Sequence, residues 1–384
     1  MAILFFEDFE EGLAPTGTNW LVGDTVVGTP AVSTSPALVG TYSLRVGRGG
    51  QNADEVIIDG SHGVIPSDTH VRVYMGFWVQ VNTAWPSAGN TELIGRVVSS
   101  GSGTAGAKVN ETGGMYLLNE AGSPARLYFQ LVLGRKEWVE IGLEQIGAGG
   151  IYYRSRKSLW VNGTLLQTYD GDIIAGAQYV TSAGVGNGNA VTGKFNWDAY
   201  YDNIIVSTTR VGTGLTIQTV RPNAEGAEDD WTNDTAGGAA DVDDIPPNTI
   251  TIYNSATGEI NPNAENQLWD FPDTTATGTV LAVQPMVYMK RYATGPTETA
   301  SLRRKLSATA VNTAIDAALE TTIRFHRACD NLDPDGAAWT KANADALLVG
   351  AQRGASATAY ALGCAEAYKS VLFRDVPKDW GGVV

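Results

Sequence analysis

The amino-terminal residues MAILFFEDFEEG place four carboxylates, Glu7, Asp8, Glu10 and Glu11, among three phenylalanines. Carboxylates grouped in this way can transfer protons or bind a hard cation such as calcium, which takes about six to eight oxygen ligands. Successive residues of a strand alternate between its two faces, so Glu7 lies on one face and Asp8 and Glu10 lie on the other. Because neither face is acidic throughout, we expect a strand whose acids lie where it runs out into solvent.

A metal site at this position needs a further ligand from another strand. The segment AYYDNIIVS at 199–207 has the composition of a strand and contains Asp202. If the first strand pairs antiparallel with it, Glu7 or Asp8 can approach Asp202, and a calcium ion between them is the alternative to a simple strand end.

The sequence encodes no strong metal site. The segment NLDPDG at 331–336 begins like a calcium-binding loop, but Ala342 stands where such a loop needs a bidentate glutamate. We expect a turn built from asparagine, aspartate, proline and glycine at this position.

Groups for nucleophilic catalysis are sparse. The histidines His62, His70 and His326 do not stand in a recognisable arrangement with serine or cysteine. Cys329 lies three residues from His326, a spacing that places the two side chains on opposite faces of a strand. Two cysteines, Cys329 and Cys364, are too few for a disulfide framework, and we expect two buried free thiols rather than one disulfide.

Composition limits the possible partners. The formal net charge is -15, and each half of the chain holds more acidic than basic residues, which argues against a phosphate-neutralising nucleic-acid surface. No segment approaches the roughly 18 apolar residues of a membrane span, and the amino terminus lacks the basic and apolar regions of a secretion signal. Charged residues make up 17% of the chain and glycine occurs 45 times, which is typical of β-structure with many turns.

Two mainly β domains are predicted, at 1–210 and 211–384. The segment VRVYMGFWVQV at 71–81 has apolar residues at every second position, as a half-buried strand does, and similar runs follow up to residue 207. The pair Asn162 and Gly163 predicts a tight hairpin, because a type I′ turn needs positive φ at both positions.

One short helix is predicted in the second domain. The segment TKANADALLVGAQRG at 340–354 has Thr340 as its N-cap and Gly350 or Gly354 as its stop. The segment 311–330 is ambiguous: its first half fits a helical face, whereas its second half alternates, and we favour a strand there.

Six short segments of the first domain follow a distinctive order: FFEDFE, GTYSLRVGRGG (40–50), MGFWVQV (75–81), EWVEIGLE (137–144), LWVNGTLL (159–166) and AYYDNIIVS (199–207). This order resembles a concanavalin A-like lectin/glucanase jelly roll of the laminin-G type. The resemblance implies an antiparallel sandwich in which the first strand pairs with the last and a tryptophan fills the interior. Trp138 and Trp160 are the candidates for that core position.

Four segments of the second domain also follow a recognisable order: VRPNAEGAEDDWTN (220–233), VDDIPPNTITIYNS (242–255), VQPMVYMKRYA (283–293) and DPDGAAWTKANADALLVGAQR (333–353). They resemble the carboxy-terminal domains of tailed-bacteriophage virion proteins, in particular head or tail accessory proteins. The resemblance implies a second β-rich, sandwich-like domain with one short helix.

Glucanases of the jelly-roll superfamily carry two catalytic carboxylates on one strand face, in an E-x-D-x-E or closely related pattern that this sequence lacks. The nearest group is Glu137, Glu140 and Glu144, in which strand parity places Glu137 on the face opposite to the other two. We interpret this group as an exposed strand edge and expect no enzymatic activity.

Sugar recognition would instead use aromatic residues in or beside loops, although packing in a core or an interface is the commoner fate of such residues. The candidates for glycan contact are Trp20, Trp85, Tyr152 and Tyr153.

We expect a non-enzymatic structural protein of a bacteriophage particle, serving as a decoration, fibre or spike component on the particle surface. Its partners would be other capsid or tail proteins, further copies of itself in a homo-oligomer, and host-surface glycans. We expect no cofactor, with the calcium ion considered above as the alternative. Two alternatives belong to other classes: a free-standing lectin or adhesin, and a glycan hydrolase with its active site at Glu140 and Glu144.

Overall fold

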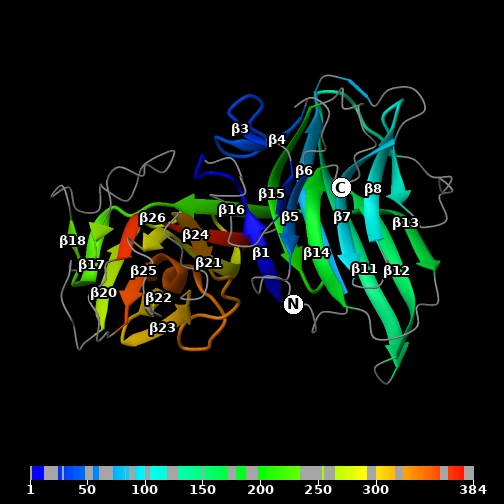
Figure 1. The fold of residues 1–384 in the computed structure, drawn as a ribbon. Helices are drawn as coiled ribbons and strands as arrows, with labels where there is room; N and C mark the ends of the chain where they lie inside the picture. Colours follow the sequence, from blue (N-terminus) through cyan, green and yellow to red (C-terminus); the bar gives the residue numbers. More distant parts are fainter. Residues whose placement is uncertain are drawn as a thin grey trace, which may run out of the picture. The chain divides into compact units, whose positions relative to one another are not determined.

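A computed structural model describes residues 2–12, 25–27, 30–47, 55–59, 72–82, 84–85, 91–99, 104–118, 129–148, 151–171, 179–186, 198–233, 253–254, 264–291, 300–315, 323–354 and 362–375. The described residues divide into two compact units, of which unit 1 ends at Thr213 and unit 2 begins at Gly214. Both are built from antiparallel strands, and unit 2 also contains one short helix, so the predicted fold class is confirmed (Figure 1). Among the described residues, no helix is long and apolar enough to cross a membrane.

Unit 1 is a sandwich of two antiparallel sheets. Sheet A has eight strands in the order β13-β12-β11-β6-β15-β4-β3, with β1 also paired to β15. Its strands are β1 (Ile3–Glu7), β3 (Ala31–Ser33), β4 (Ser43–Val46), β6 (Arg72–Val81), β11 (Lys136–Ala148), β12 (Ile151–Val161), β13 (Thr164–Gly171) and β15 (Ala199–Ser207). Sheet B has seven strands in the order β10-β9-β8-β7-β14-β5-β2. Its strands are β2 (Thr25–Val27), β5 (Glu55–Asp59), β7 (Thr91–Ser99), β8 (Thr104–Asn110), β9 (Gly114–Leu118), β10 (Phe129–Gln130) and β14 (Val180–Gly186).

The alternation along β6 explains how the two sheets pack. Met75 and Phe77 are fully buried and point toward sheet B, where they lie against Gly95 of β7. A Cβ atom at Gly95 would lie 2.7 Å from the Phe77 ring, so glycine is what allows this close approach. The even-numbered residues of β6, such as Tyr74 and Trp78, therefore lie on the opposite, outer face of sheet A.

Two predictions about strand pairing are confirmed. β1 pairs antiparallel with β15, with Phe6 opposite Ile205, so the first strand is covered by the last strand of the unit. β12 and β13 are joined by a tight turn at Asn162 and Gly163, whose φ angles are 50° and 82°. Both angles are positive, as the turn type inferred from this pair requires.

Unit 2 contains two further antiparallel sheets. Sheet C has six strands in the order β18-β19-β26-β21-β24, with β16 also paired to β26. Its strands are β16 (Leu215–Val220), β18 (Thr232–Asn233), β19 (Tyr253–Asn254), β21 (Thr279–Arg291), β24 (Arg324–Arg327) and β26 (Leu362–Arg374). Sheet D has five strands in the order β17-β20-β25-β22-β23. Its strands are β17 (Ala224–Asp229), β20 (Glu265–Asp270), β22 (Ala300–Leu306), β23 (Thr309–Ala314) and β25 (Leu348–Arg353).

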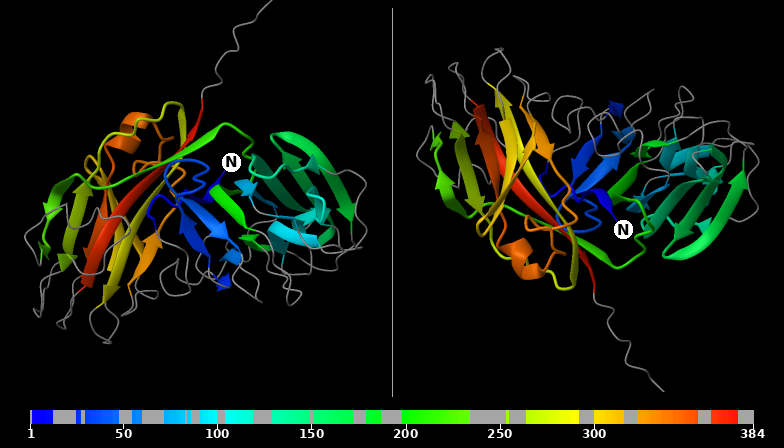
Figure 2. Two further views of the ribbon diagram at one scale, coloured as in Figure 1. Left: turned by 90° about the horizontal axis from the view of Figure 1, so that it is seen from above. Right: turned by 90° about the horizontal axis from the view of Figure 1, so that it is seen from below.

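The core of unit 2 lies between sheets C and D. The long strands β21 and β26 pair from Thr279 to Arg291, and both views in Figure 2 show the yellow β21 beside the red β26. Val283 and Val287 of β21 join one hydrophobic cluster with Leu302 of β22. Apolar side chains at alternate positions of both sheets thus fill the space between them.

The helix of unit 2 is shorter than predicted. α1 spans Lys341–Asp345, and Thr340 caps its start by accepting a hydrogen bond from a backbone N–H one turn later. The predicted continuation to 354 is wrong, because residues 348–353 form β25, which lies between β20 and β22. Gly350, expected to stop the helix, lies inside this strand, where a Cβ atom would lie 1.9 Å from a carbonyl oxygen of β20.

The ambiguous segment 311–330 contains strands at both ends. Its beginning belongs to β23, so the helical interpretation is wrong up to Ala314, whereas β24 confirms the strand predicted for its second half. The predicted turn at 331–336 is also confirmed, because the Asp333 carboxylate accepts the backbone N–H groups of Asp335 and Ala337. Both cysteines are free thiols, with Cys364 buried and Cys329 half-buried.

Candidate functional site

The outer face of sheet A carries aromatic rings and charged groups from four adjacent strands. Residues that lie opposite each other in an antiparallel pair share a face, so the register extends the outer positions of β6 across β11, β12 and β13. We call these positions the outer face: Arg72, Tyr74, Gly76 and Trp78 of β6, Trp138, Glu140, Gly142 and Glu144 of β11, Arg156, Ser158 and Trp160 of β12, and Thr168 and Asp170 of β13.

Two glycines make room for aromatic rings to lie on this face. A Cβ atom at Gly76 would lie 2.4 Å from the Trp138 ring. A Cβ atom at Gly142 would lie 2.8 Å from the Tyr74 ring and 3.1 Å from the Trp160 ring. The Tyr74 and Trp160 ring centroids are 5.9 Å apart. The two glycines therefore allow the rings to rest directly on the sheet backbone, which a larger residue would prevent.

A hydrogen bond joins Tyr74 to Glu144 beside these rings. The Tyr74 hydroxyl donates to the Glu144 carboxylate, and the Arg72 Nε atom lies 3.9 Å from the same carboxylate. Burial of the phenol, and then the hydrogen bond to Glu144, raise the pKa of Tyr74 well above its ordinary value. The phenol is therefore protonated at neutral pH and is a weaker acid than a free tyrosine.

A second charged pair lies at the rim of the same face. The Arg156 guanidinium donates two hydrogen bonds to the Asp170 carboxylate, at 2.8 and 3.0 Å. The two side chains are 42% and 44% exposed, so both charges are accessible to a ligand. The half-exposed Trp160 ring, the Tyr74–Glu144 pair and this rim form the candidate site.

Glu140 does not belong to the accessible part of the face. Its carboxylate is fully buried and accepts hydrogen bonds from Arg210 Nε at 2.9 Å and from the backbone N–H of Val211 at 2.7 Å. Burial raises its pKa even though Arg210 and the backbone donors act to lower it. The interpretation as an exposed strand edge is wrong, because β11 is flanked by β6 and β12 and the segment after β15 covers Glu140. Its role is to anchor that segment.

The expected parity of Glu137 is confirmed. Glu137 pairs with Val79, an inward-facing position of β6, whereas Glu140 and Glu144 pair with outward-facing positions. The Glu137 carboxylate accepts a hydrogen bond from the Asn162 side chain at 2.5 Å and lies 2.7 Å from Arg135 Nε. It therefore fixes the β12–β13 turn against β11.

The two tryptophans expected to fill the sandwich lie on its outside. Trp138 is 1% exposed, but it stands opposite Trp78 on the outer face, with ring centroids 5.5 Å apart. Trp160 is half-buried, and the Arg210 guanidinium carbon lies 4.9 Å from its ring centroid. Leucine, isoleucine, valine, methionine and phenylalanine fill the interior instead, since they occupy the inward parity of the same strands.

Of the four aromatic residues predicted to contact glycans, the structure describes the side chain of Trp85, and the glycan contact stays a prediction. Trp85 is half-buried, and its ring lies over Gly113, where a Cβ atom would approach it to 2.6 Å. Tyr152 and Tyr153 belong to β12, but their side chains lie outside what the structure describes, as does the whole of Trp20.

The carboxylates that open the sequence lie close together. Glu7, Asp8 and Glu11 each offer one ligand oxygen, and these atoms lie within 4.8 Å of one another. All three residues are 2–4% exposed, so the expectation of a strand end in solvent is wrong. Glu10 turns to a different partner, because its carboxylate accepts the backbone N–H groups of Thr41 at 2.7 Å and of its neighbour.

Asp202 lies near this cluster but has donors of its own. Its carboxylate accepts hydrogen bonds from the backbone N–H of Val39 at 2.8 Å, from the Ser43 hydroxyl at 3.1 Å and from the backbone N–H of Asn203 at 2.8 Å. Burial raises the pKa of Asp202 to about 8, and the charge of Asp8 contributes to the increase. Buried carboxylates gathered in this way match the oxygen donor set of calcium. The calcium site predicted between Glu7 or Asp8 and Asp202 stays a prediction, and the structure groups Glu11 rather than Asp202 with Glu7 and Asp8.

The candidate site is not among the residues predicted from the sequence, although the sequence contains a signal for it. The apolar positions of 71–81 form the core. The intervening positions hold Arg72, Tyr74, Gly76 and Trp78, a set in which a glycine lies between two aromatic residues. An outer strand face that alternates aromatic and charged residues is unusual for a solvated face and indicates recognition.

Comparison with known proteins gives structural similarities of low identity. No family model matches the chain. No curated protein matches it. Among solved structures, it is similar to the cellulose-induced protein Cip1, with 17% identity over 55% of this chain and 100% of that chain and a TM-score of 0.37.

Two polysaccharide lyases are also similar in structure. The endo-β-1,4-glucuronan lyase from the fungus Trichoderma reesei has 15% identity over 54% of this chain and 96% of that chain, with a TM-score of 0.35. The alginate lyase Aly36B has 13% identity over 46% of this chain and 84% of that chain, with a TM-score of 0.33.

The expectation that the chain has no enzymatic activity is corrected by these similarities, because two of the solved structures are polysaccharide-cleaving enzymes. The absence of an E-x-D-x-E pattern argues only against hydrolysis by a pair of carboxylates on one strand, because other reactions on glycans do not need that pattern.

Proposed function

We propose that unit 1 binds a polysaccharide chain across the outer face of sheet A and carries a glycan-acting site there. The observation that supports this proposal is the half-exposed Trp160 ring beside the Tyr74–Glu144 pair, with the Arg156–Asp170 pair at the rim. An aromatic ring offers an apolar surface to the C–H face of a sugar, while exposed charged groups bind its hydroxyl and carboxylate groups.

Two guanidinium groups favour an acidic glycan. Arg72 is 62% exposed and only loosely paired with Glu144, at 3.9 Å. Arg156 is also accessible, and a planar guanidinium binds a carboxylate through two parallel hydrogen bonds. Glucuronan and alginate, named for the two similar lyases, are therefore the first polysaccharides to test.

Tyr74 and Glu144 supply a proton donor and a proton acceptor on the same face. The Tyr74 hydroxyl is protonated at neutral pH and faces the bound sugar, so it can deliver a proton to a leaving glycosidic oxygen, although its raised pKa makes it a weaker acid than a free tyrosine. The Glu144 carboxylate is 18% exposed and can accept a proton from the bound sugar. Hydrolysis by two facing carboxylates does not fit this arrangement, because Glu140 is buried and bound to Arg210 and the backbone.

Calorimetric titration of the full chain with glucuronan, alginate and a neutral β-glucan tests the binding. We expect acidic chains to bind more tightly, and Trp160→Ala to weaken that binding at least about tenfold, which is a loss of about 1.4 kcal/mol. Thr168→Ala, on the same face but without an aromatic or charged group, is the matched control. Equal binding of acidic glycans by the two variants would exclude the outer face as the glycan-binding site.

Tyr74→Phe separates binding from reaction. This change keeps the ring on Gly142 and removes the hydroxyl, so binding should persist while turnover falls. Release of reducing ends and ultraviolet absorbance of an unsaturated product distinguish hydrolysis from β-elimination. Turnover that survives in Tyr74→Phe would assign the chemistry to other groups, and no turnover on any glycan would leave a lectin-like binding function.

The role in a bacteriophage particle stays a prediction from the resemblance of the second unit. It is compatible with a glycan-acting first unit, since a surface component that contacts a host meets host polysaccharide. A mass spectrum of purified particles tests it, and the absence of this chain from particles would refute it.

A further inference from the structure

Strand β23 forms one edge of sheet D and is bonded to the rest of the sheet on one side. It pairs with β22 through a two-residue turn, so that Leu306 lies opposite Thr309 and Arg304 opposite Val311. In such a hairpin the residues that flank the turn exchange backbone hydrogen bonds, and every second residue beyond them does the same. The bond from the Ile315 N–H to the Ala300 carbonyl, at 2.9 Å, continues this odd-numbered series.

The even-numbered residues of β23 therefore direct their backbone groups outward. Ala310, Asn312 and Ala314 present three N–H and three C=O groups along this edge, and among the described residues no strand pairs with them. A row of backbone groups without a partner strand is a template for adding another strand.

The two edges of sheet D differ in their protection. The opposite edge strand, β17, has the sequence AEGAED, with three acidic residues and an irregular register between Glu225 and Asp229. Charge and irregular register both prevent edge-to-edge pairing. β23 has the sequence TAVNTA, which is uncharged, contains no proline, and shows no register shift. Of these two edge strands, β23 is therefore the one suited to pairing with a further strand.

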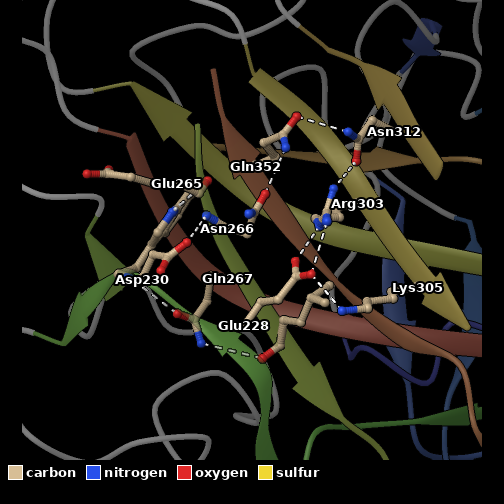
Figure 3. A network of polar contacts seen from close by, with 11 residues as sticks. Glu228, Asp230, Glu265, Asn266, Gln267, Arg303, Lys305, Asn312 and Gln352 are labelled. Atoms are coloured by element: carbon tan, nitrogen blue, oxygen red, sulfur yellow. Dashed lines mark hydrogen bonds and ion pairs between the residues drawn. The ribbon is translucent and has the colours of Figure 1, made fainter. Parts of the chain in front are cut away.

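A ladder of side-chain amides runs across sheet D and ends at this edge (Figure 3). The Gln352 amide donates to Asn266 at 2.7 Å, and the Asn312 amide donates to Gln352 at 2.9 Å. Arg303 in turn donates to the Asn312 carbonyl oxygen at 3.1 Å. Asn312 thus retains one amide hydrogen and one oxygen lone pair for a further partner beyond the edge.

Two cations beside the ladder share one carboxylate. The Glu228 carboxylate accepts hydrogen bonds from Arg303 at 2.6 and 3.1 Å and from Lys305 at 2.8 Å (Figure 3). These cations lower the pKa of Glu228, so the carboxylate stays ionised and offsets one of the two positive charges. The edge strand β23 itself is uncharged, so a second copy that approaches this edge meets amides and backbone groups.

We propose that β23 pairs antiparallel with β23 of a second copy of this chain, about a two-fold axis at Asn312. Ala310 then lies opposite Ala314 of the second copy, Asn312 lies opposite its own equivalent, and Val311 lies opposite Thr313. The outward N–H and C=O groups are self-complementary in this register, because 310, 312 and 314 are placed symmetrically about 312. Sheet D then continues across ten strands in the two copies, and their two amide ladders meet at the axis. This assembly does not depend on the glycan-acting function proposed for unit 1.

Analytical ultracentrifugation of the full chain over a range of concentrations tests the pairing. We expect the unmodified chain to form dimers. In A310K/A314K, like charges face each other across the axis, so this variant should sediment as a monomer at concentrations where the unmodified chain is dimeric. In A310K/A314E, opposite charges face each other, so dimerisation should be retained. A227K, on the exposed edge strand β17, is the matched control and should leave the dimer unchanged.

We expect the variants to fold, because the substituted side chains are exposed and their N–H groups do not bond to β22. Circular dichroism and unfolding midpoints check that they do. A monomeric unmodified chain overturns the proposal. Equal association of A310K/A314K and A310K/A314E would also overturn it, because the register about Asn312 requires them to differ.

Discussion

Replacing Glu140 by alanine is expected to destabilise unit 1 by about 2–4 kcal/mol. A hydrogen bond to a charged acceptor contributes roughly 1.5–3 kcal/mol, so the bonds from Arg210 and from the Val211 N–H together contribute about 3–6 kcal/mol. Part of this stabilising contribution is offset by the cost of burying the Glu140 charge, which also raises the pKa of Glu140 and which alanine removes. Arg210 is 39% exposed and can be rehydrated, which further limits the loss.

Equilibrium urea unfolding followed by tryptophan fluorescence measures this change, because Trp78, Trp138 and Trp160 lie on the same face as Glu140. The two units can unfold separately, so the free energy is taken from the transition that these tryptophans report. Glu144→Gln is the control on the same strand and face; it should cost less than about 1 kcal/mol, because Glu144 is partly exposed. A change below about 0.5 kcal/mol for Glu140→Ala, or equal changes for both variants, would refute the anchoring role of Glu140.

Three further predictions concern pH, cation binding and packing. Because burial raises the folded pKa of Asp202 to about 8, above the roughly 3.9 of an unfolded aspartate, the folded state binds the extra proton and unit 1 should lose stability as pH rises between these values. Asp202→Asn should flatten that slope in thermal unfolding measured across the pH series, and an unchanged slope would contradict the assignment. Calcium should raise the Tm of unit 1 by neutralising the negative charge of the carboxylates around Glu7, and chelation should reverse the increase. An equal increase in Tm for Glu7→Gln would exclude this cluster as the calcium site. Gly142→Ala should destabilise unit 1 by about 1–3 kcal/mol and weaken glycan binding, because its Cβ would lie 2.8 Å from the Tyr74 ring, and unfolding and titration of this variant check both effects.

Much of the strand architecture was predictable because it depends on local pattern. Apolar residues at every second position predicted β6, and the positive φ angles of Asn162 and Gly163 were implied by the residue types. The pairing of β1 with β15 came from the resemblance to a jelly roll, and the structure confirms it.

The candidate site was less predictable, because alternation defines two faces without saying what covers the outer one. The sequence pattern predicts that Glu140 is exposed, yet Arg210 and Val211, about 70 residues further along the chain, fold over it. The sequence predicts that Trp138 fills the space between the sheets, yet its side chain lies on the outer face of β11, where it is buried against Trp78 and Gly76. Neither contact is visible in a window of neighbouring residues.

The sequence by itself determined the class of fold, the positions of most central strands and the tight turn at Asn162, since these follow from side-chain period and backbone preference. Only the tertiary structure decided which carboxylates are buried, which aromatic face is accessible and where the helix after Thr340 ends. The physical reason is the same in each case: burial and strand pairing depend on segments distant in sequence, and sheet D takes residues 348–353 as its central strand despite their helical pattern.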